Sequence, residues 1–313
     1  MLVFILTTGE CNLECSYCGG SFPPWRVPWK EQYSLEELKQ SLEGAENLAI
    51  AFYGGEPLLN ARFMEKVMDE VEAEHFIVQT NGTLVEKLRP DYWRRMDAVL
   101  LSIDGVREVT NYYRGMEVYE KVVEAAKYLR RAGFEGDLIA RMTVSRRSDV
   151  FRDVKHLLEL GLFDHVHWQL DVVWCERWRG FREWVDTSYK QGIAKLVELW
   201  MSELKKGRIL GLVPFLGILQ REFFNRNVAP PCGAGSESVA ISTDGRILAC
   251  PIAVDVKWAE LGAVGRDKVT DIIGRVGIGK PCTSCRFFKW CGGRCLYAHK
   301  ERLWGEEGFQ EVC

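Results

Sequence analysis

The stretch Leu2–Cys18, LVFILTTGECNLECSYC, joins an apolar run to three closely spaced cysteines. The apolar run predicts a buried strand, and Cys11, Cys15 and Cys18 follow it in the spacing C-x3-C-x2-C. Three thiolates on one loop can hold three irons of a four-iron, four-sulfur cluster and leave the fourth iron without a protein ligand. A structural zinc site, the alternative, needs four ligands, and no fourth Cys or His stands nearby. The stretch therefore favours an iron–sulfur cluster with an open iron.

Short apolar runs alternate with helical patterns from this stretch to about residue 175. The six runs are Leu2–Thr8, Leu48–Tyr53, Phe76–Gln79, Val99–Ile103, Leu138–Val144 and Val166–Val173. The first helical stretch opens with Ser34-Leu-Glu-Glu37, which has the form of a capping box. Alternating strands and helices predict an α/β fold with a parallel sheet, here a partial (β/α)6 TIM-like barrel with its chemistry at the C-terminal strand ends. The pattern alone leaves a doubly wound sheet open.

The pattern changes after residue 185. An amphipathic helix is expected from about Tyr189 to Lys206, followed by an apolar helical segment to about Phe224. From residue 230 the chain is rich in Cys and Gly, and Val239–Ile241 and Ile247–Leu248 flank a turn that predicts a β-hairpin. We therefore expect three parts: the barrel over 1–185, a helical bridge over 186–229 and a small Cys-rich domain over 230–313.

Composition excludes several classes of function. A formal charge of -3 and a pI near 6.1 give no net attraction to nucleic acid. The N-terminus lacks the basic leader and cleavage site of a secretory signal, and no apolar run is long enough to cross a membrane. We expect a cytoplasmic protein, where clustered free thiols are typically metal ligands, as the 11 cysteines suggest.

A second motif, Tyr53-Gly-Gly-Glu-Pro57, follows the second predicted strand. Together with C-x3-C-x2-C and an aromatic residue before the third Cys, it makes the chain resemble the radical S-adenosylmethionine (SAM) enzymes. The resemblance implies that the open iron is chelated by SAM and that the Gly-Gly-Glu-Pro segment binds its amino group. It implies a ribose or carboxylate contact for Ser102, and we expect Arg141 to neutralise the carboxylate. The candidate SAM contacts are Tyr17, Gly54, Gly55, Glu56, Pro57, Asn81, Ser102, Arg141 and Gln169. For Asn81, and for Asp104, turn formation before Gly is an equal alternative.

Seven cysteines in the last part of the chain resemble the signature of the SPASM domain, which holds two auxiliary clusters. The resemblance assigns the outer cluster to Cys282, Cys285, Cys291 and Cys313. It assigns the inner cluster to Cys232, Cys250 and Cys295, one ligand short. Either an iron is open or Cys175 completes the set, and we favour Cys175 as a small buried hydrophobe. A zinc ribbon on four of these cysteines is the alternative.

The resemblance implies an oxidoreductase that cleaves SAM reductively to a 5'-deoxyadenosyl radical and abstracts hydrogen from a peptide or protein to install a modification. Thioether formation, carbon–carbon crosslinking, epimerisation and oxidation all begin with that abstraction. The expected partners are the polypeptide and a reductant such as ferredoxin or flavodoxin. Because the first strand begins almost at Met1, recognition is expected to need a separate leader-binding protein or a leaderless target.

Other functions remain as alternatives. Anaerobic sulfatase maturation is one, although Pro251 stands where those enzymes usually carry Asp. Radical synthesis of a small-molecule cofactor is another, and a non-enzymatic electron-transfer protein is the least favoured. Two aromatic segments bear on substrate choice: Phe22–Trp29 near the cluster loop, and the Trp- and Arg-rich 168–184. Such residues suit a peptide surface, but for the second segment we favour packing between domains.

Overall fold

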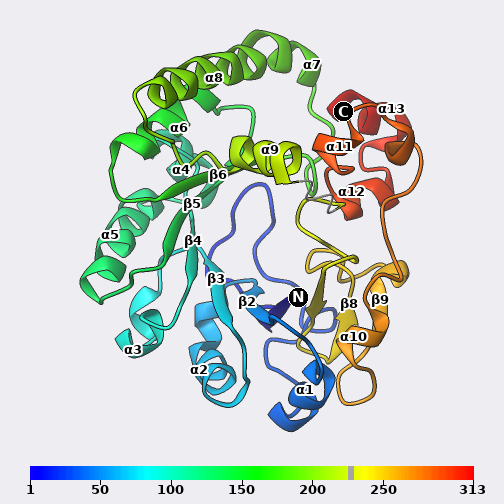
Figure 1. Cartoon of the computed structure of the whole chain (residues 1–313). Coiled ribbons are helices and arrows are strands. Elements are labelled where there is room, and N and C mark those ends of the chain that lie inside the picture. Colours follow the sequence, from blue (N-terminus) through cyan, green and yellow to red (C-terminus); the bar gives the residue numbers. More distant parts are fainter. Residues whose placement is uncertain (225–228) are drawn as a thin grey trace.

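The computed structural model describes residues 1–224 and 229–313, and within these ranges one nine-stranded sheet organises the chain (Figure 1). The first six strands are parallel neighbours in the order β6-β5-β4-β3-β2-β1. They are β1 (Leu2–Thr8), β2 (Ala49–Gly54), β3 (His75–Thr80), β4 (Ala98–Ser102), β5 (Asp137–Val144) and β6 (His165–Leu170). In a doubly wound sheet the order in which successive strands are added reverses part of the way across the sheet. The sequential order confirms the predicted partial barrel.

Helices cover the outer face of these strands (Figure 1). They are α1 (Leu35–Leu42), α2 (Ala61–Glu70), α3 (Pro90–Trp93), α4 (Arg107–Arg114), α5 (Val118–Arg131) and α6 (Val150–Glu159), with the 3-10 turns η1 (Pro57–Asn60) and η2 (Val85–Lys87). The predicted capping box at α1 is present, because Ser34 Oγ accepts from the Glu37 backbone N–H at 3.2 Å and Glu37 Oε2 accepts from the Ser34 N–H at 2.8 Å.

Strand β5 shows how the sheet separates core from site. Alternate residues Leu138, Ala140 and Met142 are fully buried in the main hydrophobic core, whereas Arg141 and Thr143 line the cavity on the concave side. Successive side chains of a strand point to opposite faces. The same alternation that builds the core therefore delivers polar side chains to the inside of the barrel.

The predicted hairpin is also present, and it joins the barrel. Strand β7 (Ser238–Ile241) pairs in parallel with β1, and β8 (Arg246–Leu248) and β9 (Glu260–Ala263) follow in antiparallel order. The Cys-rich part thus continues the main sheet, and the proposed domain boundary near residue 230 stays a prediction.

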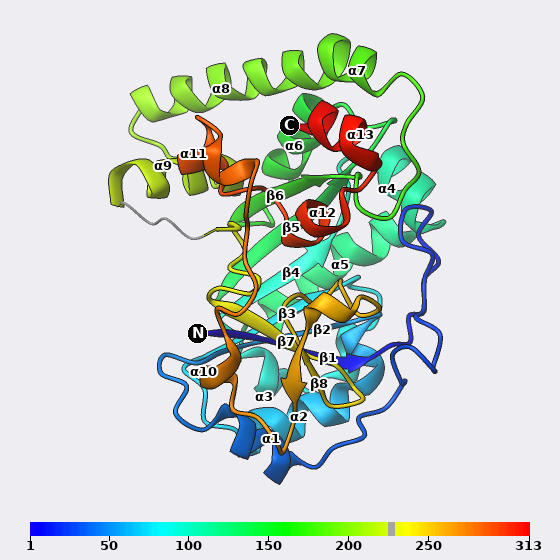
Figure 2. The same cartoon turned by 90° about the vertical axis from the view of Figure 1, so that its right-hand side faces the viewer.

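The remaining helices lie in the bridge, beside α1 and β9, and in a C-terminal cap formed by residues 288–312 (Figure 2). They are α7 (Phe181–Trp184), the π-helical turn η3 (Val185–Tyr189), α8 (Lys190–Lys205), α9 (Val213–Phe224), η4 (Lys257–Ala259), α10 (Val269–Ile272), η5 (Cys282–Ser284), α11 (Phe288–Cys291), α12 (Leu296–Glu301) and α13 (Gly305–Val312). Residues 225–228 of the predicted bridge lie outside the described residues. Across the described ranges, no helix combines the length and apolarity needed to span a membrane.

Candidate functional site: a cysteine-lined cavity in the barrel

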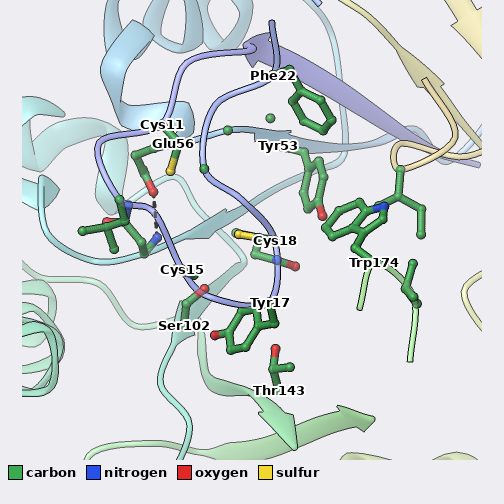
Figure 3. Close-up of a pocket in the computed structure, with 18 of the residues that line it drawn as sticks. Cys11, Cys15, Tyr17, Cys18, Phe22, Tyr53, Glu56, Ser102, Thr143 and Trp174 are labelled. Carbon is green, nitrogen blue, oxygen red and sulfur yellow. Dashed lines mark hydrogen bonds between the residues drawn. The ribbon is translucent and has the colours of Figure 1, made fainter. Parts of the chain in front are cut away.

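A cavity of about 470 Å³ opens at the C-terminal ends of the parallel strands (Figure 3). The three cysteines of the first loop line it. So do eight of the nine candidate SAM contacts: Tyr17, Gly54, Gly55, Glu56, Asn81, Ser102, Arg141 and Gln169. The ninth, Pro57, is buried at the first position of η1 and is absent from the lining. The position of Pro57 fits the start of a helical turn, where a missing N–H leaves no bond unmade.

Backbone hydrogen bonds join the Gly-Gly-Glu segment to the end of β1 and the start of the cysteine loop. The Gly55 N–H donates to the Thr8 carbonyl at 3.0 Å, and the Glu56 N–H donates to the Glu10 carbonyl at 2.8 Å. A Cβ on Gly54 would lie 2.3 Å from the Thr8 oxygen, and one on Gly55 would lie 2.2 Å from the Glu10 oxygen. The resemblance named these glycines as candidate SAM contacts. The structure shows that close approach of the two chain segments already requires them.

The carboxylate of Glu56 is buried and held by the chain itself. Oε1 accepts from Thr80 Oγ1 at 2.6 Å and from the Leu58 N–H at 3.1 Å, and Oε2 accepts from the Asn81 N–H at 2.7 Å. Burial raises the pKa of Glu56 to about 7, against the opposing effect of these donors. A carboxylate has about four acceptor positions. Three are used, so Oε2 has one left for a cationic ligand group.

Asn81 links the third strand to the cysteine loop. Its Nδ2 donates to Asn12 Oδ1 at 2.8 Å, and its Oδ1 accepts from both the backbone N–H and the hydroxyl of Thr83. The Asn81 side chain also lowers the pKa of Cys11, against the larger opposing effect of burial. Turn chemistry and site chemistry, which the sequence left as alternatives, are therefore combined in one residue.

A buried ion pair anchors the aromatic residue of the cysteine loop. Arg114 Nε and Nη2 each donate to Asp104 at 2.8 Å, and both side chains are at least nine-tenths buried. Tyr17 donates its hydroxyl to Asp104 Oδ2 at 2.8 Å, and the Thr143 N–H donates to Oδ1 at the same distance. Asp104 therefore positions Tyr17 rather than facing the cavity. Arg114 was not predicted, because nothing in the sequence of α4 marks it as a partner of Asp104.

Arg141 brings a positive charge to the cavity wall. Its guanidinium donates to the Met142 carbonyl at 2.9 Å and to Gln169 Oε1. Among the described residues, no carboxylate lies within ion-pair distance of it, and burial lowers its pKa. Arg141 is half-buried and lines the cavity, and a guanidinium forms charge-assisted hydrogen bonds to carboxylates, so this wall suits a ligand carboxylate. Ser102 pairs with Arg141 across β4 and β5 and also lines the cavity.

The three cysteines of the first loop line one cavity, and Figure 3 shows the sulfur atoms of Cys11 and Cys18 in it. The Cys15 thiol hydrogen-bonds to Cys18 and thereby lowers the pKa of Cys18 to about 6. Burial raises the pKa of Cys11 to about 11, with the charges of Glu56 and Cys18 acting in the same direction. Soft thiolates at this spacing, beside a cavity large enough for a small ligand, fit an iron–sulfur cluster.

The C-terminal cysteines fall into two sets of neighbours. Burial raises the pKa of Cys282. The negative charges of three nearby thiolates, Cys313, Cys291 and Cys285, raise it further. Burial raises the pKa of Cys250, and the negative charges of the nearby Cys295 and Cys232 thiolates raise it further. These neighbours belong to the same sets that the resemblance named, and their role as cluster ligands stays a prediction. No three His, Cys, Asp or Glu side chains in the described ranges have the spacing of a single bound ion.

A buried donor atom of Arg294 lies near the outer set of cysteines. Its Nε is buried and has no hydrogen-bond partner within the described part of the chain. Arg294 also lies near enough to Cys313 to stabilise that thiolate. A buried N–H without an acceptor is unfavourable, and the sulfur atoms of an anionic cluster would satisfy it.

Cys175 lies in a different environment. Its thiol donates to the Asp171 carbonyl at 2.9 Å and accepts from Trp178 Nε1 at 3.3 Å. It packs in an aromatic cluster that also contains Trp304 and Val312 from the C-terminal cap. The thiol is half-buried and packs as the sequence favoured, and whether Cys175 completes the inner set stays a prediction.

The aromatic segment 168–184 mostly packs, as expected, with one exception. Trp178 and Phe181 are buried against Trp304, and Arg177 forms ion pairs with Glu307 and Glu311 of α13. Trp174 instead lines the cavity and is 45% exposed (Figure 3). The loop after β6 therefore joins the cavity wall to the C-terminal helix.

The Cys-rich part supplies the far wall of the cavity, which the sequence did not predict. Ile252 and Asp255 come from just after Cys250, and Tyr297 comes from just after Cys295. Asp255 forms an ion pair at 2.9 Å with Arg26 of the aromatic loop 22–29. The only sequence signal was nearness to a predicted ligand, and only the fold brings these residues to the first cluster loop.

Comparison with known proteins identifies the family. The model of the radical SAM superfamily matches residues 5–167, which is slightly more than half of the chain. The cysteine-type anaerobic sulfatase-maturating enzyme of Clostridium perfringens is 23% identical over 320 residues, covering 91% of this chain and 85% of that protein. Mycofactocin maturase MftC of Mycobacterium tuberculosis is 30% identical over 152 residues, covering 45% and 37% respectively.

Solved structures share the fold over nearly the whole chain. Native anSMEcpe with bound AdoMet superposes with a TM-score of 0.75 at 20% identity, covering 99% of this chain and 95% of that one. Streptococcus suis SuiB bound to its precursor peptide SuiA gives 0.64 at 13% identity, covering 95% and 72%. AdoMet is SAM, the ligand expected from the sequence. The chain is therefore an enzyme of the radical SAM superfamily, related to anaerobic sulfatase maturase and to other radical SAM maturases.

Proposed function

We propose that this enzyme uses a SAM-derived radical to modify a residue of a peptide or protein. The observation that carries the proposal is the shared cavity: the first cysteine loop, the candidate SAM contacts and the C-terminal wall all face one space. When bound, a four-iron cluster on Cys11, Cys15 and Cys18 supplies the electron that cleaves SAM to methionine and a 5'-deoxyadenosyl radical.

The chain's own residues orient SAM in this proposal. The remaining acceptor position of Glu56 Oε2 receives the amino group of SAM, as a carboxylate forms charge-assisted bonds to an ammonium. Arg141 is on β5, away from Glu56, and has no anionic partner among the described residues. In this proposal it binds the carboxylate of SAM. Binding both the amino and the carboxylate group of SAM restricts its reactive carbon to one position in the cavity, and such positioning lowers the barrier of a reaction.

The proposed substrate is a polypeptide because of the aromatic side chains in and beside the cavity. Phe22, Pro23 and Trp174 line it, and Trp25 beside them is 86% exposed. The loop that carries Trp25 is fixed, since Val27 is fully buried and Arg246 donates to the Arg26 carbonyl at 2.9 Å. Rigid exposed aromatics are typical anchors for peptides, and the related SuiB was solved with a precursor peptide.

The test is a single-turnover assay on anaerobically reconstituted, chemically reduced protein. We expect 5'-deoxyadenosine from SAM, and deuterium transfer into it from synthetic peptides that match short open reading frames beside the gene, Cys-containing ones first. Absence of 5'-deoxyadenosine under all conditions would contradict a radical enzyme. Its formation with deuterium from a small molecule but from no peptide would shift the proposal to cofactor biosynthesis.

We also propose two auxiliary four-iron clusters, on the two C-terminal cysteine sets. With the first cluster they give about twelve irons per chain. Replacing Cys313 with Ala is expected to remove about four of these irons, because Cys313 closes the outer set from the end of α13. Iron and acid-labile sulfide assays measure the loss, and 5'-deoxyadenosine formation shows that the first cluster is kept. Full iron content in Cys313→Ala would show that this residue is no ligand.

A further inference from the structure

A buried histidine lies against the outer cysteine set. His299 is on α12 and is 6% exposed, and its Nδ1 lies 3.5 Å from Cys282 Sγ. The ring of Phe309, from α13, packs edge-on against the imidazole, with the two ring centroids 6.2 Å apart. This contact fixes the orientation of the imidazole. The side chain is thus held beside Cys282, which is a proposed ligand, and His299 is not itself one of the proposed ligands.

The hydrogen bonds of the imidazole determine its tautomer. The backbone N–H of Gly279 donates to His299 Nε2 at 3.1 Å. A backbone N–H can only donate, so Nε2 acts as acceptor and carries no proton. In neutral imidazole the proton is then on Nδ1, the atom that faces Cys282.

The neighbouring arginine does not change this assignment. Arg302 Nη1 lies 3.3 Å from Nδ1, but it also donates to the His299 carbonyl at 2.9 Å. Its Nε pairs with Glu306 at 2.9 Å, and Nη2 donates to the Lys280 carbonyl. Arg302 therefore has acceptors of its own, whereas Nδ1–H has the Cys282 sulfur.

We propose that His299 donates an Nδ1–H hydrogen bond to the Cys282 thiolate of the outer cluster and raises that cluster's reduction potential. The inference rests on the auxiliary clusters of the proposed function. Reduction adds negative charge to the cluster and its sulfur ligands, so a donor to a ligand sulfur stabilises the reduced form more than the oxidised form. Among the residues that the structure describes, the buried Nε–H of Arg294 has no acceptor, and because Arg294 lies near Cys313 it provides a second donor beside the same set.

Two substitutions distinguish the roles of the two ring nitrogens, Nδ1 and Nε2. His299→Asn places an amide N–H near the position of Nδ1 and keeps the donor to Cys282. His299→Gln reaches the position of Nε2, keeps an acceptor for Gly279 and loses the donor. The measurement is a redox titration of the reconstituted full-length protein followed by electron paramagnetic resonance, with iron counted for each variant.

We expect His299→Gln to shift the midpoint potential of one cluster to a more negative value and to leave the other two unchanged, while His299→Asn stays close to the parent protein. Equal potentials in all three proteins, at full iron content, would overturn the hydrogen bond and leave the cluster assignment intact. Equal negative shifts in both variants would assign the effect to loss of the ring rather than to the donor. A parent protein that binds no iron at Cys282 would contradict the auxiliary-cluster proposal itself.

Discussion

Replacing Cys15 with Ala is expected to abolish 5'-deoxyadenosine formation and to remove about four irons per chain. Cys15 is buried, at 5% exposure, and its sulfur faces Cys18 on the loop that lines the SAM cavity. Two thiolates that remain on a loop cannot hold the cluster in place of three. The measurements are chromatographic detection of 5'-deoxyadenosine after reduction, and iron content.

Cys175→Ala is the matched control, because Cys175 packs among aromatic side chains outside all three cysteine sets. This variant should keep both the iron and the SAM cleavage of the parent protein. Cleavage that persists in Cys15→Ala would contradict the assignment of the first cluster. Iron loss in Cys175→Ala would instead reopen its role as the fourth ligand of the inner set.

Replacing Arg114 with Met is expected to destabilise the fold by about 3–5 kcal/mol, the usual cost of leaving one partner of a buried ion pair without the other. Asp104 is fully buried and would keep only the neutral donors Tyr17 and Thr143. Because Asp104 also holds Tyr17, the cysteine loop should loosen as well, and cluster loading should fall. Denaturant unfolding of the cluster-free protein measures the first effect without interference from iron.

Arg107 on the same helix provides the control. It pairs with Glu120 at 2.7 Å, but its side chain is 62% exposed. Exposed ion pairs contribute about 0–1 kcal/mol, so Arg107→Met should unfold nearly as the parent protein does. Equal destabilisation by the two substitutions would show that burial of the Asp104 pair has no special role.

Much of the fold was predictable because its signals are local. The six strands were placed within a few residues by their apolar runs, and the α1 capping box was read from Ser34 and Glu37. The last strand was predicted to reach Val173, but β6 ends at Leu170. Beyond it the Asp171 N–H bonds to the Val144 carbonyl and the chain turns into the loop that carries Trp174. Apolar composition continued past the strand because that loop also packs.

The candidate site was predictable in its ligands and less so in its supports. Cysteine spacing is a property of one short loop, so the sequence alone was enough to place these three thiols together, and their role as iron ligands stays a prediction. The partners of those residues come from distant segments: Arg114 supports Asp104, and Asp255 and Tyr297 close the cavity from the Cys-rich part. No local pattern encodes such pairs, since each depends on which strand ends the fold brings together.

The sequence by itself determined the parallel α/β architecture, the three cysteine groups and the membership in one enzyme superfamily, because periodicity and motif spacing act over a few residues. The tertiary structure decided what those residues do beside one another. It showed that Gly54 and Gly55 make room for neighbouring carbonyls, that Cys175 packs with aromatic side chains and that the His299 Nδ1 faces Cys282. Each of these depends on a contact between side chains or backbone atoms that only the folded chain brings within reach.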